Sequence, residues 1–128
     1  METKEYLVLS RGQWDASVRK EDIEAAITKF YDWITDHITH GRMKTGSRLG
    51  TDRAVASKDG VVIDAPFCEG KEVIGGYWFI LASSLREAAD YAAQNPCAAY
   101  GLTYEIRSLE AERASAYTTT NETPLHER

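Results

Sequence analysis

Carboxylates, an ammonium group and a thiol are concentrated in residues 64–72 of the chain. This stretch contains Asp64, Cys68, Glu69, Lys71 and Glu72. Carboxylates that lie close together raise one another's pKa, whereas a nearby Lys lowers it, so such a group can work as a general acid or base. We therefore take Asp64, Lys71 and Glu72 as candidate catalytic residues and Glu69 as a candidate ligand-binding residue. The alternative interpretation is structural, with Asp64 capping a turn and Lys71 forming an ion pair with a neighbour.

Three further residues are candidates for binding a ligand. Trp14 lies in a polar connection, where an aromatic side chain either lines a pocket or covers the edge of the core. Glu105 and Arg107 alternate with apolar residues in a predicted strand, so they share the face opposite the apolar set. There they form either an ion pair at an interface or the polar lining of a cleft.

Two histidines near the end of a predicted helix are candidates for binding a metal ion. His37 and His40 are spaced i and i+3, so they share one face of the helix. A metal site would need a further ligand, whereas two histidines near a helix C-terminus suit the helix dipole without any function. We adopt the second interpretation. Because no P-loop, dinucleotide-binding fingerprint, Cys-x-x-Cys or His-Glu-x-x-His motif occurs, we expect neither a metal nor an organic cofactor.

The composition limits the class of protein. The chain has 128 residues, enough for one domain, and its 15 basic and 20 acidic side chains give a net charge of −5. A negatively charged chain is a poor electrostatic match for a phosphate backbone, so we expect no nucleic-acid partner. No apolar run reaches the ~18 residues of a membrane span, and no secretory signal is recognisable. We therefore expect a cytoplasmic protein with free cysteines and no membrane partner.

The spacing of apolar residues predicts the elements that must hold these side chains. Steps of three and four residues predict an amphipathic helix from Lys20 to its closing residue Gly41. A second helix begins at a capping box formed by Ser84 and Glu87 and stops before Pro96. Strands are predicted at residues 6–9, within 46–50, and at 53–57, 61–64, 74–81 and 102–107, with Asp59-Gly60 as a hairpin turn.

This order of elements favours one fold class. Two strand–helix–strand units in series are typical of a ferredoxin-like α+β sandwich. We predict an antiparallel sheet with both helices on one face and a β-hairpin as an insertion. Residues 1–109 form this domain. Residues 110–128 lose the periodicity and gain Thr, Ser, Glu and Pro, which indicates a polar C-terminal tail, either partly disordered or lying across the domain.

The two most apolar strands indicate that the sheet is covered on both faces. A sheet with one face in water alternates strictly between apolar and polar residues. Residues 6–9 do not alternate, and in residues 74–81 Tyr77 and Phe79 point one way while Trp78 and Ile80 point the other. We therefore predict a homodimer that packs sheet against sheet around a two-fold axis. The alternative covers are the C-terminal tail and the loop at residues 42–50.

The order of the motifs resembles that of a known family. Asp64-Ala65-Pro66-Phe67 is followed by Cys68-Glu69-Gly70-Lys71-Glu72, then by Gly75-Gly76-Tyr77 and the final Glu105-Ile106-Arg107. With the first strand and helix, this pattern resembles the YCII-related family, in particular the branch named for its Asp-Gly-Pro-Phe motif. Ala65 and Gly70 depart from that branch, which has Gly and Thr there. The resemblance spans residues 6 to about 109 and implies a dimeric α+β barrel.

Two functions of different classes are consistent with these residues. In the first, the protein binds or transforms a small organic molecule in a pocket, where Asp64, Lys71 and Glu72 orient the ligand or move a proton. In the second, it is a non-enzymatic accessory or regulatory module whose dimer surface binds another protein. The resemblance gives this second role a link to transcription, because some members of the family accompany sigma factors. A concave site of roughly 300 Å³ or more with Asp64 or Lys71 on its wall would favour the first function.

Overall fold

The computed structural model describes residues 2–64 and 73–128, so Cys68, Glu69, Lys71 and Glu72 lie outside the described residues. The elements are β1 (Lys4–Arg11), α1 (Lys20–Thr39), β2 (Met43–Arg48), β3 (Arg53–Ser57), β4 (Gly60–Asp64), β5 (Ile74–Ala82), α2 (Leu85–Ala93) and β6 (Thr103–Ser108). Short 3₁₀ turns follow at η2 (Pro96–Tyr100) and η3 (Leu125–Glu127). Within the described residues, no helix is both long and apolar enough to cross a membrane.

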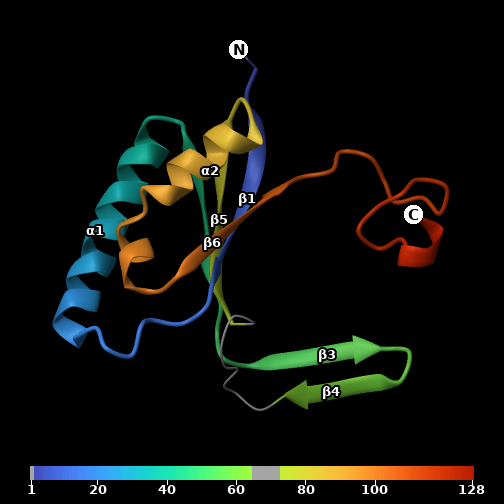
Figure 1. The fold of residues 1–128 in the computed structure, drawn as a ribbon, viewed down its shortest axis with the longest axis horizontal. Coiled ribbons are helices and arrows are strands. Elements are labelled where there is room, and N and C mark those ends of the chain that lie inside the picture. The colour runs from blue at the N-terminus through green and yellow to red at the C-terminus, as the bar shows by residue number, and fades with distance from the viewer. Residues whose placement is uncertain (1, 65–72) are drawn as a thin grey trace.

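The main sheet has the strand order of a ferredoxin-like fold. Its order is β2-β5-β1-β6, and every neighbouring pair is antiparallel. Figure 1 shows both helices on one face of this sheet, while β3 and β4 form a separate hairpin that projects beyond it. The predicted α+β fold with two helices on one face and an inserted hairpin is therefore confirmed.

The helix boundaries follow the signals in the sequence. α1 ends at Thr39, and Gly41 then takes a φ of +74°, which a residue with a side chain rarely adopts. At the start of α2, the Ser84 hydroxyl accepts a hydrogen bond from the Glu87 amide at 3.1 Å. The Glu87 carboxylate accepts in turn from the amide of Ser83 rather than Ser84. The second half of the capping box is thus shifted by one residue.

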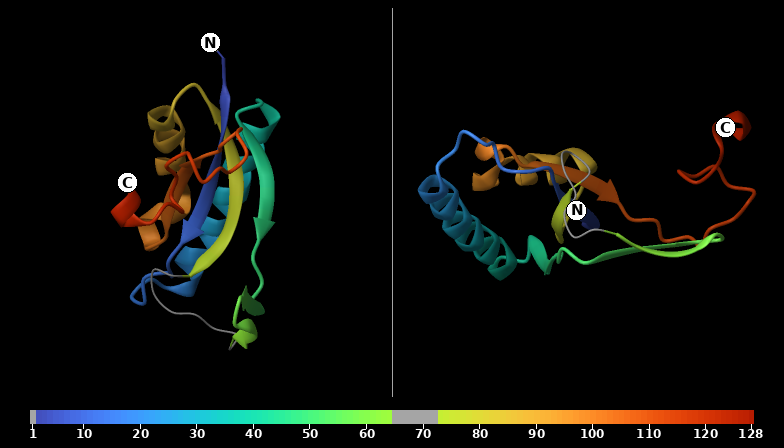
Figure 2. Two further views of the ribbon diagram at one scale, coloured as in Figure 1. Left: turned by 90° about the vertical axis from the view of Figure 1, so that its right-hand side faces the viewer. Right: turned by 90° about the horizontal axis from the view of Figure 1, so that it is seen from below.

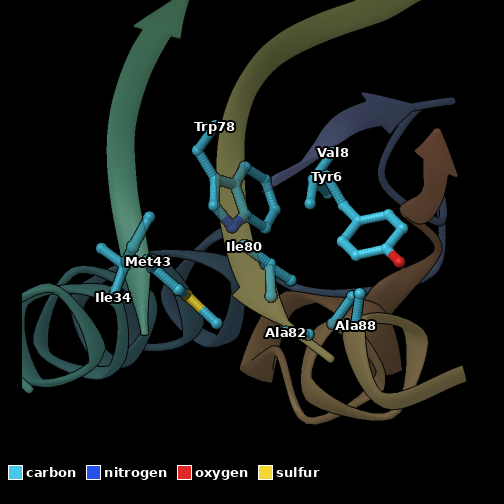
Figure 3. Close-up of a cluster of buried hydrophobic side chains, with 9 residues drawn as sticks. Tyr6, Val8, Ile34, Met43, Trp78, Ile80, Ala82 and Ala88 are labelled. Carbon is cyan, nitrogen blue, oxygen red and sulfur yellow. The ribbon is translucent and has the colours of Figure 1, made fainter. Parts of the chain in front are cut away.

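The core lies between the sheet and the helices. Figure 3 shows Val8 of β1 together with Trp78 and Ile80 of β5, and these side chains are almost completely buried. Ile34 of α1 and Met43 of β2 complete the same cluster. Burying one such side chain contributes about 1.5–3 kcal/mol to folding. This cluster therefore fixes α1 against the sheet.

β2 and β5 approach each other more closely than side chains allow. A Cβ atom on Gly46 would clash with the carbonyl oxygen of Tyr77, and one on Gly76 would lie 2.9 Å from the carbonyl oxygen of Ser47. The register of the two strands also shifts between Lys44 and Ser47. Both glycines are therefore required by the backbone of the neighbouring strand.

The hairpin and the tail extend on the side of the sheet that the helices leave open (Figures 1 and 2). All residues of β3 are exposed, and Val61 and Ile63 of β4 are 69% and 76% exposed. In the tail, the hydrogen bonds of residues 115–128 stay within the tail. It runs away from the sheet (Figure 2), so it does not lie across the domain as one of the sequence interpretations had it.

Candidate functional site

A cavity of about 520 Å³ lies between α1 and the sheet. One wall is a row of α1 side chains, and the other is formed by the ends of the four sheet strands. The described lining residues are Ile27, Phe30, Tyr31, Ile34, Thr35 and Ile38 of α1, Ser10, Thr45–Arg48, Gly75–Trp78 and Tyr104 of the strands, and Trp14 and Cys97 of the connections. This volume is in the range of small-molecule sites.

Trp14 lies on the wall of this cavity because its loop is held at both sides. The Gly12 amide donates to the Val73 carbonyl at 2.9 Å, and the Asp15 amide donates to the Tyr100 carbonyl at 2.8 Å. Gly12 has a φ of +89°, which turns the chain out of β1. Trp14 is half-buried there. Of the two sequence interpretations of Trp14, the geometry matches the one in which it lines a pocket.

Two titratable groups of the described cavity wall, the Tyr104 phenol and the Cys97 thiol, have pKa values raised by burial. Burial raises the pKa of the Tyr104 phenol, and a hydrogen bond with the Ser10 hydroxyl opposes this rise only in part. Burial also raises the pKa of the Cys97 thiol, whose sulfur lies 3.6 Å from the Ala26 carbonyl oxygen. A buried thiol of raised pKa is chemically inert. Both groups are therefore hydrogen-bonding, uncharged parts of the wall near neutral pH.

Arg48 is the charged member of the described lining. It is the last residue of β2 and it is exposed at the edge of the cavity. The lining residues described by the structure include no carboxylate. The described part of this wall therefore carries one positive charge and no negative one.

Glu105 and Arg107 lie on the opposite face of the sheet from the cavity. Glu105 accepts from Arg11 at 3.0 Å and from Arg107 at 3.1 Å, so the three side chains form an ion cluster on β1 and β6. Tyr104 and Ile106, which alternate with them, pack against the buried core. The structure therefore separates this pair from Trp14, although all three are candidates for ligand binding from the sequence.

Asp64 ends β4, where it pairs with Arg53 in the ladder of the hairpin. The structure describes the backbone of Asp64 but not its side chain. The other candidates of its segment, Glu69, Lys71 and Glu72, lie outside the described residues. A cavity of the size expected for a small-molecule protein is therefore present, and the roles of Asp64, Glu69, Lys71 and Glu72 stay predictions.

The two histidines of α1 have different surroundings. His37 is buried, and its Nδ1 accepts a hydrogen bond from Nε of Arg42 at 2.8 Å. His40 is exposed, and its Nδ1 lies 2.8 Å from the carbonyl oxygen of Asp36. Among the described residues, no three His, Cys, Asp or Glu side chains are grouped so that they could hold a metal ion.

Most of the cavity wall carries no signal in the sequence. The apolar stripe of α1 predicts an amphipathic helix but not a cavity beside it, and in the structure Ile38 is 38% exposed and Tyr31 is 50% exposed. Arg48 belongs to no recognisable motif, and the sequence alone does not show that the end of β2 faces α1. The signal available in the sequence was the width of the apolar stripe on α1. The stripe is wider than its buried part and has an aromatic residue at its edge.

The comparisons with known proteins agree with this fold. A model of the YCII-related domain matches residues 5–110, which is more than half of the chain and contains both helices and every lining residue of the cavity. No curated protein matches the chain. From this match, the chain belongs to the YCII-related family.

Proposed function

We propose that this protein binds a small organic molecule in the cavity between α1 and the sheet, without a metal or an organic cofactor. The observation that carries the proposal is the cavity itself, with a volume of about 520 Å³. Its wall combines aromatic side chains such as Trp14 and Phe30 with a few polar groups. Small-molecule sites have this composition, since apolar walls supply affinity and a few polar groups fix orientation.

The proposal concerns binding first and reaction second. A general base near neutral pH needs a pKa close to that pH, and the burial of Tyr104 and Cys97 raises their pKa values away from it. The described wall therefore lacks a base of its own. If the bound molecule is transformed, we propose that Asp64, Lys71 and Glu72 move the proton, as expected from their sequence.

A thermal-shift screen of a metabolite library tests the binding proposal. Thr35 is exposed and lines the cavity, so Thr35→Trp should fill the cavity without disturbing the core. Thr28 is exposed on the same helix and does not line it, so Thr28→Trp is the matched control. We expect compounds that raise the Tm of the wild type and of Thr28→Trp, but not that of Thr35→Trp. Hits that stabilise all three proteins equally would contradict the proposal.

We also propose membership of the Asp-Gly-Pro-Phe branch of the family. The support is in the sequence, where Asp64-Ala65-Pro66-Phe67 precedes Gly75-Gly76-Tyr77. Within the described part of the chain, the requirement for glycine at position 76 has a structural reason in its close contact with Ser47. The cytoplasmic location expected from the sequence stays a prediction.

A second candidate function, a dimerisation module, is favoured by the open face of the sheet. Leu7, Leu9, Tyr77, Phe79 and Leu81 are only half-buried there. Ion pairs surround this apolar patch, with Lys44 and Glu5 3.4 Å apart at one side and the Arg11–Glu105–Arg107 cluster at the other. An apolar centre with a charged rim is the usual composition of a protein interface.

The hairpin and the tail support the same proposal. Both project from the open side of the sheet (Figure 2), and Val61 and Ile63 of β4 are largely exposed. An isolated two-stranded hairpin is at best marginally stable in water, so it needs a surface to pack on. We propose a homodimer in which the open faces meet and each hairpin packs on the partner. A regulatory role that binds another protein would use this same surface.

A further inference from the structure

The open face of β1 carries a row of four side chains, with an acid at one end and a base at the other. The row is Glu5, Leu7, Leu9 and Arg11, and it alternates with residues that point toward the helices. Arg11 belongs to the row because its guanidinium contacts Glu105 of β6 at 3.0 Å. The side chains of Glu5 and Arg11 are 34% and 32% exposed. When the row is reversed about its centre, the acid and the base change places, and so do the two leucines.

The centre of this row lies on a line that crosses three strands. Val8, midway between Leu7 and Leu9, pairs with Trp78 of β5 and with Ile106 of β6. Val8 and Trp78 point toward the helices, as Figure 3 shows, and Ile106 packs against the same core. Because successive side chains of a strand point to opposite faces, the residues before and after these three lie on the open face.

The residues on the two sides of this line match each other. On β5 they are two aromatic residues, Tyr77 and Phe79. On β6 they are an acid and a base, Glu105 and Arg107. The open face is therefore complementary to itself about one line, in its apolar centre and in its charges.

A two-fold axis along this line brings a second copy face to face with its strands reversed. In such an interface residue i contacts residue j of the partner, and residue j contacts residue i. Glu5 then faces the partner's Arg11, and Glu105 faces the partner's Arg107. An axis along β1 instead places Glu5 opposite the partner's Glu5 and Arg11 opposite the partner's Arg11. The charges therefore favour the first orientation, because like charges placed opposite each other cost affinity.

We propose that a second copy of this chain docks on the open face with the two β1 strands antiparallel, and that Glu5–Arg11 and Glu105–Arg107 pairs join the protomers. This inference rests on the second proposed function, the dimerisation module, because it gives the orientation and the charge contacts of the same surface. Sheets packed face to face lie about 10 Å apart, a gap that extended Glu and Arg side chains from the two sheets span together. The leucines and aromatic rings meet inside this charged rim.

An exchange of charge between protomers tests this orientation. The variants are Glu5→Arg and Arg11→Glu, and sedimentation equilibrium gives the dimer dissociation constant of each variant alone and of their equal mixture. Alone, each variant places like charges opposite each other twice, so its dissociation constant should rise at least about tenfold. In the mixed dimer the introduced arginine faces the introduced glutamate, and the two native residues face each other. The mixture should therefore regain an affinity close to that of the wild type.

A control variant separates contacts between protomers from contacts within one protomer. The Glu5 carboxylate lies 3.4 Å from the Lys44 ammonium of its own chain. Glu5→Arg combined with Lys44→Glu restores this internal pair but still places an arginine opposite the partner's Arg11. We expect the double variant to dimerise as weakly as Glu5→Arg, and a return to the wild-type affinity would overturn the proposed orientation.

The wild type and the mixture separate this inference from the proposed function. A dimeric wild type whose single variants dimerise equally well, or whose mixture gains no affinity, overturns the orientation and leaves the dimerisation module in place. A monomeric wild type rejects both. Glu105→Arg mixed with Arg107→Glu repeats the exchange at the second pair, and this mixture decides on the orientation if a variant of the first pair fails to fold.

Discussion

The Arg42 guanidinium donates a hydrogen bond from Nε to Nδ1 of the buried His37, with 2.8 Å between the two nitrogens. This bond joins the last turn of α1 to the residue before β2. Nδ1 can accept a hydrogen bond only when that nitrogen carries no proton. The rings of Trp33 on α1 and Tyr91 on α2 pack against His37, with ring centroids 5.0 and 5.6 Å from that of its imidazole.

This relationship predicts an acid-sensitive fold. Burial, and then the charge of Arg42, lower the pKa of His37 below its ordinary value of 6.5. The unfolded chain therefore binds a proton at a pH where the folded chain does not, so stability is complete above pH 6.5 and falls as the pH drops below it. Urea titrations should show a slope of at most about 1.4 kcal/mol per pH unit from this group.

His37→Gln should remove this dependence of the unfolding free energy on pH, because glutamine can accept a hydrogen bond from Arg42 but does not titrate. His40→Gln is the matched control, since His40 is exposed on the same turn. A wild-type slope that persists in His37→Gln would show that another group causes the acid sensitivity.

Two adjacent glycines should respond differently to a methyl group. A Cβ on Gly76 would meet the backbone of Ser47 at 2.9 Å, whereas one on Gly75 would meet only the Ser10 hydroxyl at 3.7 Å. Gly76→Ala should therefore cost about 1–3 kcal/mol of unfolding free energy, as overpacked sites do. Gly75→Ala should change it by less than about 0.5 kcal/mol. Chemical denaturation of both variants measures this difference, and equal losses would mean that β2 does not approach β5 so closely.

The open face of the sheet predicts a dimer that one charge disrupts. Leu9 lies there, next to Tyr77 on β5 and Glu105 on β6. Light scattering should give a mass of twice 14.3 kDa for the wild type, and Leu9→Arg should weaken the dimer at least about 100-fold, because it places a charge in the apolar centre. Leu85→Arg, at an exposed residue of α2, should stay dimeric. A monomeric wild type at micromolar concentration would refute the dimer.

Lys71 gives a test of the segment singled out in the sequence. It precedes Gly75, a residue of the cavity wall, by only a few positions. If Lys71 orients the ligand, Lys71→Ala should reduce the Tm shift produced by library hits while the Tm of the free protein changes little. Hits with the same Tm shift in Lys71→Ala would remove this role from Lys71.

The fold could be predicted from the sequence where a pattern repeats. The stripe of α1, the Asp59-Gly60 turn and the alternation of Tyr104 with Glu105 are each set by local chemistry, and the structure places them as expected. The cavity could not be found in this way. Its wall depends on the pairing of Arg48 with Gly76 across a shifted register, which is a long-range relationship that no local pattern encodes.

A crystal structure of the protein with a hit from the library screen shows directly whether the ligand binds in the cavity between α1 and the sheet. We expect electron density for the ligand between α1 and β5, in contact with Trp14 and Trp78. Density on the open face of the sheet or at the hairpin, with the cavity holding only water, would contradict it.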